Sequence, residues 1–319
     1  EMSRGLGDVY KRQVPIQTSK GFRWNLDLNY GANSSKVVKL DDEGLITSYR
    51  LYSSGIQILA SVGEAYGTLF GTSYVRDANG NVVVDANGLP KISTTNKTLG
   101  KFTPDWTGGI SNTFSYRSLS LSFLIDASVG GSIFSNTNKT GKYTGVLANT
   151  LSGRDAEHGG LWYYTAAMGN NVRLPESPSY SVSSDGLYYA QVNGQSTRVY
   201  QDGIMVEGVT ESGSKNEEVV SAEKYYHRIY SIAEANVYDA SYVKLREVAL
   251  SYRLPRLWTQ KLHLQEASVT LTGRNLWTIY KSVPNIDPES ALTTGNAQGV
   301  EAYSLPTTRS FGVNLSVKF

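Results

Sequence analysis

The final stretch of the chain, Arg-Ser-Phe-Gly-Val-Asn-Leu-Ser-Val-Lys-Phe at 309–319, decides the fold class. One parity is apolar throughout, with Phe311, Val313, Leu315, Val317 and Phe319, and the other is polar or small. Successive side chains of a β-strand point to opposite faces, so this strand has one apolar and one polar face. About ten alternating residues cross a bilayer at the tilt of barrel strands, whereas strands in soluble sandwiches usually have about five or six. The stretch therefore favours a membrane-spanning strand, with a sandwich strand as the alternative.

Composition also favours an all-β chain with many turns. The 319 residues include 31 glycines and 22 tyrosines, and only 18% are charged. Helix-rich soluble proteins are poorer in glycine and tyrosine than this. The chain has no cysteine, which excludes disulfides, thiol nucleophiles and Cys-ligated zinc. Its net charge of +2, with no basic block, gives no sign of a nucleic-acid partner.

The same two-residue period recurs along the chain. It predicts strands at 22–30, 106–116, 118–128, 241–254 and 267–279. Weaker alternation predicts one more strand at 47–60, so about seven strands are expected with the terminal one. The apolar parity changes within 241–254, which indicates either a β-bulge near Glu247 or a first half that leaves the membrane.

The connections between these strands alternate between short and long. The long ones lie at about 61–105, 129–240 and 281–308. Outer-membrane barrels have short periplasmic turns and long extracellular loops, and a soluble meander has no reason for such alternation. The sequence therefore predicts the C-terminal portion of a transmembrane antiparallel β-barrel with three long extracellular loops. Because bacterial single-chain barrels have an even number of strands, we expect further strands upstream.

The first residues are expected to be foreign to the fold. Gly-Asp-Val-Tyr-Lys-Arg-Gln at 7–13 resembles a translated sequencing adapter. We therefore treat 1–13 as a non-native leader and assign the barrel portion to 14–319.

No constellation of catalytic or metal-binding residues stands out. Two Asp-Ala-Asn-Gly stretches, 77–80 and 85–88, predict tight turns, since neither has the further ligands of a calcium loop. Asp155, Glu157 and His158 could form a nucleophile or metal site with Ser152, but all four lie in one segment without a second ordered partner. We expect no enzyme activity, no metal and no cofactor.

Four ordered motifs carry a family resemblance. They are Asp239–Pro255 (DASYVKLREVALSYRLP), Val269–Trp277 (VTLTGRNLW), Asp287-Pro-Glu289, and Leu305–Gly312 (LPTTRSFG). Together they resemble the C-terminal barrel of the SusC/RagA family of TonB-linked outer-membrane proteins of Bacteroidetes, over about 20–319.

This resemblance implies the last third of a barrel of about 22 strands in a Gram-negative outer membrane. The family imports large nutrients, often oligosaccharides and sometimes peptides. Its partners are a SusD-like surface lipoprotein that acts as a lid, TonB, the barrel assembly machinery and outer-membrane lipid. TonB would act through an N-terminal plug and TonB box, which this sequence lacks. Two alternatives remain open, a receptor for siderophores or cobalamin and a soluble or surface-displayed β-sandwich that binds a ligand.

Trp162, Tyr163 and Tyr164, in the longest expected loop, are candidate contacts with the ligand or a partner. Aromatic faces stack on sugar rings, and a tyrosine hydroxyl adds a hydrogen bond. Interfaces enrich the same residues, so packing of the loop against the lid protein or the barrel rim is the favoured explanation, ahead of contact with the ligand.

Two further sites follow from the resemblance. Phe311 and the terminal Phe319 match the aromatic final strand that the barrel assembly machinery recognises. Asp287-Pro-Glu289 is expected to be a turn that holds an outer loop, with charges that only solvate this loop.

Overall fold

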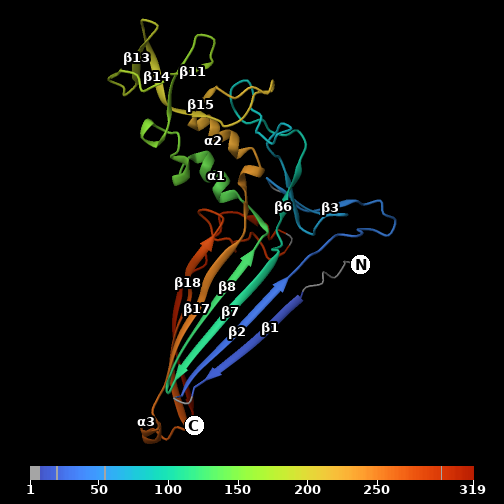
Figure 1. Ribbon diagram of the computed structural model, residues 1–319, viewed down its shortest axis with the longest axis vertical. Coiled ribbons are helices and arrows are strands. Elements are labelled where there is room, and N and C mark those ends of the chain that lie inside the picture. Colours follow the sequence, from blue (N-terminus) through green and yellow to red (C-terminus); the bar gives the residue numbers. More distant parts are fainter. Residues whose placement is uncertain (1–7, 19–20, 54, 296) are drawn as a thin grey trace.

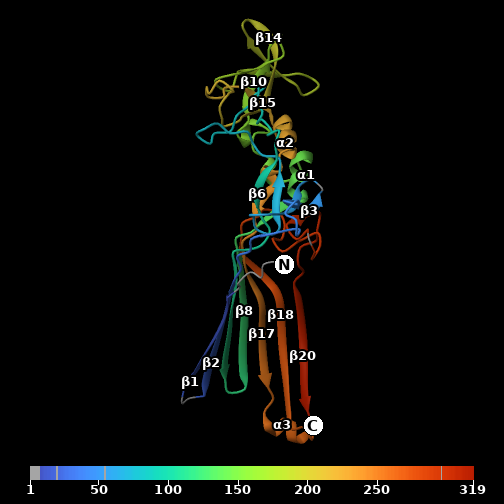
Figure 2. The same ribbon diagram turned by 90° about the vertical axis from the view of Figure 1, so that its right-hand side faces the viewer.

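A tall sheet of a single layer forms one half of the computed structural model, and folded loops stack at one end of it (Figures 1 and 2). Residues 8–18, 21–53, 55–295 and 297–319 are described. The tall sheet has seven antiparallel strands in the order β1-β2-β7-β8-β17-β18-β20. These are β1 (Asp8–Gln17), β2 (Phe22–Ala32), β7 (Trp106–Tyr116), β8 (Leu119–Val129), β17 (Tyr242–Arg253), β18 (Glu266–Lys281) and β20 (Ser310–Lys318). The predicted all-β class, as an unclosed portion of an antiparallel barrel, is confirmed.

The register keeps the apolar parity of every strand on one side of this sheet. Leu250 of β17 lies opposite Leu121 of β8 and Leu271 of β18, and Leu271 lies opposite Val313 of β20. Directly opposed residues point to the same face, so these side chains form one continuous apolar face. Val313 is 74% exposed and Leu271 51% exposed. In a sandwich this face would be buried against a second sheet, so the sandwich alternative is wrong for this sheet.

The opposite parity forms the polar face of the sheet. On β20 it presents Ser310, Asn314, Ser316 and Lys318, and on β8 it presents Ser120, Ser122 and Asp126. Sheets with one apolar and one polar face are what the period-two sequence pattern encodes.

The seven strands are not the same seven that the sequence predicts. The stretch 47–60 belongs to a separate four-stranded sheet, in which β4 buries Ile58, Leu59 and Ala60 in succession. Three consecutive buried residues explain its poor alternation, because both faces of that strand are covered. The seventh strand of the tall sheet is β1, which pairs with β2 along its whole length. It includes residues 8–13 of the expected leader; residues 1–7 lie outside the described residues.

All three long connections leave the same end of the tall sheet (Figure 1). They run between β2 and β7, between β8 and β17, and between β18 and β20. The turns at the other end are short, and one of them carries the helix α3 (Arg256–Lys261). The predicted alternation of short and long connections is therefore present, with 33–105 as one long connection that includes the 47–60 stretch.

The long connections are folded into small sheets and helices of their own. A four-stranded sheet contains β3 (Ser48–Ser53), β4 (Gln57–Ser61), β5 (Thr68–Gly71) and β6 (Lys97–Lys101). A six-stranded sheet contains β10 (Leu161–Thr165), β11 (Asn171–Arg173), β12 (Tyr180–Val182), β13 (Tyr188–Val192), β14 (Gln195–Met205) and β15 (Val219–Ser221). A three-stranded sheet joins β9 (Ser132–Ser135), β16 (Val237–Asp239) and β19 (Val300–Glu301). The helices are α1 (Asn136–Thr144) and α2 (Ala222–Tyr230), with 3-10 turns at Ala148–Thr150, Ala156–His158 and Glu234–Asn236.

The hydrophobic core lies in these folded loops. Phe134, Ile58, Leu69 and Val300 are almost fully buried in one cluster, which joins strands from all three long connections. Side chains from distant parts of the chain therefore hold the loops together as one body above the sheet. Among the described residues, none of the helices is long and apolar enough to span a bilayer.

Candidate functional site

A β-bulge in β17 re-aims the side chains at the loop-bearing end of the tall sheet. Against β8, Leu245 and Glu247 lie opposite the consecutive residues Ile125 and Leu124, which leaves Arg246 as the extra residue. The register against β18 also shifts here, but there the additional residue lies on β18, between Arg274 and Trp277. One extra residue restores the parity, so Val243 and Leu245 share the apolar face with Val248. Of the two sequence hypotheses for this strand, the bulge near Glu247 is confirmed.

The bulge also turns Lys244 to the polar face, where it lies opposite Asp126. Its side chain is only 3% exposed, and Nζ lies 2.5 Å from Asp287 Oδ1 and 2.5 Å from Glu289 Oε2. A buried ammonium is strongly unfavourable unless it is paired. The two carboxylates of the Asp287-Pro-Glu289 turn supply that pairing.

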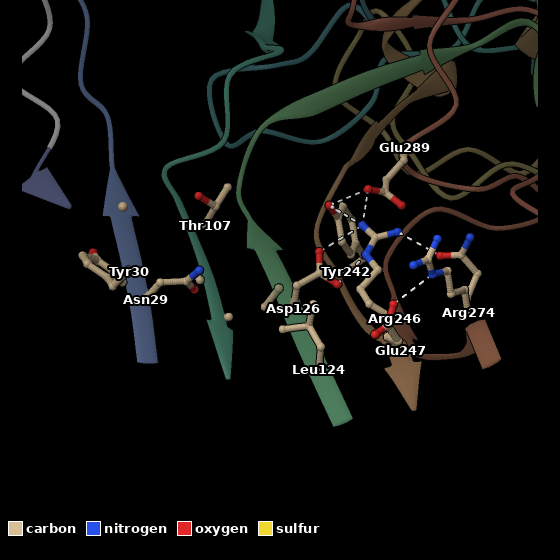
Figure 3. Close-up of a pocket in the computed structure, with 15 residues that line it drawn as sticks. Asn29, Tyr30, Thr107, Leu124, Asp126, Tyr242, Arg246, Glu247, Arg274 and Glu289 are labelled. Atoms are coloured by element: carbon tan, nitrogen blue, oxygen red, sulfur yellow. Dashed lines mark hydrogen bonds and ion pairs between the residues drawn. The ribbon is translucent and has the colours of Figure 1, made fainter. Parts of the chain in front are cut away.

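Arg246 extends the same arrangement across the face of the sheet. Its Nε donates to Asp126 Oδ1 at 2.6 Å and its Nη2 to Asp126 Oδ2 at 2.9 Å, a bidentate pair. It also pairs with Glu289, which accepts a further hydrogen bond from the Tyr242 hydroxyl at 2.9 Å. Figure 3 shows the side chains of Asp126 on β8, Tyr242 and Arg246 on β17, and Glu289 in the connection between β18 and β20 pointing toward one another. We call Asp126, Lys244, Arg246, Asp287 and Glu289 the charge cluster.

The carboxyl groups of Asp287 and Glu289 are held in their ionised form. Burial alone would raise the pKa of Asp287, but the hydrogen bonds from Lys244 and Thr307 outweigh burial and lower the pKa to about 2. Burial also acts to raise the pKa of Glu289, but the hydrogen bonds from Arg246 and Lys244 outweigh it, so the pKa is lowered. The expectation that these charges only solvate a loop is wrong, because they pin the connection 282–309 to the tall sheet.

A second contact holds the same connection at its other end. Glu301 of β19 is fully buried and accepts hydrogen bonds from Ser135 Oγ at 2.7 Å and Thr137 Oγ1 at 2.5 Å. Thr137 lies in the first turn of α1, where a carboxylate is stabilised by the free N–H groups and by the helix dipole. The connection 282–309 thus ties the sheet to α1, and α1 packs on α2.

A hollow of about 670 Å³ opens beside the charge cluster on the tall sheet. Asn29, Asp126, Arg246, Glu247 and Arg274 contribute polar groups to it. Gly31, Gly108, Gly109 and Ala127 line it as well, and such small residues leave room beside the sheet. Arg274 Nε pairs with Glu247 Oε2 at 2.9 Å, and both side chains are well exposed. The surface can offer ionic and hydrogen-bonding groups of both signs to a polar molecule.

Comparisons with known proteins agree with this geometry. The chain is 25% identical to TonB-dependent receptor P3 of Formosa agariphila over 331 aligned residues, which cover 95% of the chain and 27% of the relative. It is 24% identical to TonB-dependent receptor P26 of the same organism, over 93% of the chain and 27% of the relative. The chain thus spans about a quarter of the length of these curated relatives. No family model matches it.

Solved structures show the same fold. A structure of the RagAB peptide transporter matches 99% of the chain and 29% of its own chain, with a TM-score of 0.55 and 18% identity. The RagAB peptide importer in an open-open state matches with a TM-score of 0.54 and 16% identity. The resemblance to SusC/RagA-like TonB-dependent receptors is confirmed. These relatives are receptors and transporters, which agrees at the family level with a role other than catalysis.

In this SusC/RagA-like chain, the three predicted contact residues lie in β10 of the six-stranded loop sheet. Trp162 is 7% exposed and stacks on Tyr180 at 5.1 Å between ring centroids. Tyr163 is 4% exposed and donates a hydrogen bond to Asp202 at 3.1 Å. Burial raises the pKa of Tyr163, and the neighbouring Asp202 charge adds to this shift. The first two aromatics therefore pack the loop itself, and only Tyr164 is part-exposed. Contact with a ligand or partner stays a prediction.

The other predicted residues are distributed as follows. Phe311 is 80% exposed on the apolar face and Phe319, just beyond β20, is 84% exposed. Both are accessible, and their role as an assembly signal stays a prediction. Asp155 caps the 3-10 turn at Ala156–His158 by accepting the His158 N–H, which gives it a local structural role. Within the described ranges, no group of three or more His, Asp or Glu side chains could hold a metal ion.

The charge cluster is the feature that sequence reasoning missed. Its members come from three places, 126, 244–246 and 287–289, that only the strand pairing brings together. One signal was present, since Lys244 and Arg246 are charged residues within a strand that is otherwise apolar on alternate positions. Charged residues inside a membrane-spanning segment generally face partners or a water-filled cavity.

Proposed function

We propose that the chain forms the C-terminal wall and the outer loops of an outer-membrane receptor that imports large nutrients, oligosaccharides or peptides, with energy from TonB. The observation that carries this proposal is the continuous exposed apolar face of the tall sheet, uncovered by any second sheet within the described residues. Such a face is stable against lipid hydrocarbon and unfavourable in water. The chain would lie in the outer membrane of a Gram-negative, Bacteroidetes-like cell.

The orientation follows from the connections. All long connections leave one end of the sheet, which in outer-membrane barrels is the extracellular end. The helices α1 and α2 and the six-stranded sheet, which belong to the long loops, would then face the extracellular medium. A SusD-like lipoprotein would cover them as a lid. The RagAB neighbour, described as a peptide transporter, supports a two-component importer and makes peptides a reasonable cargo beside oligosaccharides.

The test is the behaviour of the full-length receptor that contains this chain. It should fractionate with the outer membrane, and its gel migration should change on heating, as the folded barrel unfolds. If it remained soluble without detergent, the proposal would be abandoned.

Orientation and partner need separate measurements. A cysteine at Met168, which is 95% exposed in the loops, should react with a membrane-impermeant maleimide on intact cells, whereas one at Leu262 in the short-turn end should not. A SusD-like lipoprotein should copurify with the receptor in mild detergent. A siderophore or cobalamin receptor would share the wall and the energy source, so uptake of labelled oligosaccharide or peptide by cells that express the receptor distinguishes it.

A further inference from the structure

The short turn that carries α3 exposes three large apolar side chains. It lies at the end of the tall sheet opposite the long loops, beside the C-terminus (Figures 1 and 2). Leu257 is 74% exposed, Trp258 58% and Leu262 62%. Thr259 on the other side of the helix is only 2% exposed. The helix therefore turns a small residue to the protein and large apolar residues outward.

This turn is fixed to the sheet on both sides. Arg253 Nε pairs with Glu266 Oε1 at 2.8 Å across the base of the turn. Gln265 N donates to Lys318 O at 2.8 Å, which ties the turn to β20. The exposed residues are thus held in place by the surrounding structure.

Two cations accompany the apolar residues. Arg256 and Lys261 are exposed, and neither takes part in an ion pair with another described residue. A short helix with tryptophan, leucines and cationic side chains suits the interface between hydrocarbon and headgroups, where cations meet lipid phosphates and tryptophan is enriched.

The apolar face of the sheet continues to the same end. Tyr252, just before the turn, is 43% exposed, and Phe319 is 84% exposed. We propose that α3 lies in the headgroup region of the adjacent membrane leaflet, where Leu257, Trp258 and Leu262 contact acyl chains and Arg256 and Lys261 contact anionic phospholipid headgroups. This inference rests on the proposed function, since it requires that the sheet spans a bilayer.

Spin labels on single cysteines in the full-length receptor test this placement. The receptor is reconstituted into vesicles of phosphatidylcholine and phosphatidylglycerol, with any native cysteines replaced. The label at Leu257→Cys should be relaxed more by oxygen, which concentrates in hydrocarbon, than by a water-soluble nickel chelate. Val313→Cys on the apolar face and Asn314→Cys on the polar face are matched references for lipid and for water or protein contact.

The outcomes separate the inference from the proposed function. If Val313→Cys reports lipid and Leu257→Cys reports water, the wall spans the membrane but α3 does not touch it, and the inference is overturned. Low accessibility of Leu257→Cys to both reagents would mean that protein covers α3, which also overturns it. A water-like Val313→Cys would refute the proposed function itself.

The headgroup contact has its own readout. In vesicles without phosphatidylglycerol, the oxygen accessibility at position 257 should fall at least twofold. The double substitution Arg256→Gln and Lys261→Gln should remove this lipid dependence. Dependence that persists in the double variant would overturn the assignment of the two cations to anionic headgroups.

Discussion

Lys244 Nζ lies 2.5 Å from Asp287 Oδ1, and the two residues, 43 positions apart in the chain, are both buried. Glu289 completes the arrangement from the same turn. A charge in this position is favourable only while its partners are present, so this contact makes the attachment of the connection 282–309 depend on a few side chains.

Lys244→Met should destabilise the receptor strongly. It removes the ammonium and leaves the buried Asp287 carboxylate without its cation, while Glu289 keeps Arg246, with an expected cost of about 3–5 kcal/mol. The measurement is the temperature at which the folded form disappears in a heat-modification gel of the full-length receptor. Lys39→Met is the matched control, because its ion pair with Asp42 is exposed and contributes about 0–1 kcal/mol. Equal effects of both substitutions would contradict the buried pairing.

The same contact predicts a dependence on pH. The pKa of Asp287 is lowered from 3.8 to about 2 in the folded protein, because hydrogen bonds from Lys244 and Thr307 outweigh burial. A lowered carboxyl pKa adds stability above the unfolded value, and this stability, on the order of 2 kcal/mol, is lost as pH falls through the folded value. Between pH of about 4 and 2, the unfolding temperature of the wild type should therefore fall more steeply than that of Asp287→Asn. Parallel curves would show that Asp287 is not held ionised.

Glu301→Gln should loosen the outer loops without affecting the sheet. The substitution keeps the shape but removes the charge at the start of α1, and it places an NH₂ group among hydroxyl and N–H donors. We expect a cost of about 1–3 kcal/mol. Hydrogen exchange should become faster in 136–138 and 300–304 while strands of the tall sheet stay protected. Glu217→Gln, at an exposed position, is the control that should leave both regions unchanged.

Leu315→Arg should impair insertion into the membrane. Leu315 is 66% exposed on the apolar face near the middle of β20, and arginine facing lipid at the midplane costs about 2–4 kcal/mol. Asn314→Arg places the same side chain on the polar face and should cost little. The comparison is made by urea titration of both variants folded into vesicles. If Leu315→Arg left the urea unfolding curve unchanged, this face would not contact hydrocarbon.

The strands of the tall sheet were predictable where their period is strict. Alternation at 22–30, 106–116, 118–128 and 309–319 identifies each strand because only one face is apolar. The prediction that 47–60 belongs to the tall sheet is wrong, since a strand buried on both faces loses this signal. Residues 8–13 resemble an adapter in sequence, but the structure pairs them with β2.

The site was less predictable than the sheet. Trp162 and Tyr163 have the composition of a binding surface, but the partners that bury them lie on β12, β13 and β14 and cannot be read from neighbouring positions. The Asp287 carboxylate likewise meets Lys244 only through long-range pairing. Local patterns predict which face a strand residue occupies, whereas contacts between loops depend on tertiary packing.

The extra residue in β17 has a further consequence. Side chains alternate between the two faces of a strand, and the extra residue Arg246 shifts that alternation by one against β8. Deleting it would move every preceding residue of β17 to the opposite face, so Lys244 would lie on the apolar face and Val243 and Leu245 on the polar face. A relative that lacks this extra residue should have apolar residues at the positions where this chain has charged ones in the first half of the strand, and charged residues where this chain has apolar ones. An alignment gap at this position should therefore coincide with that exchange.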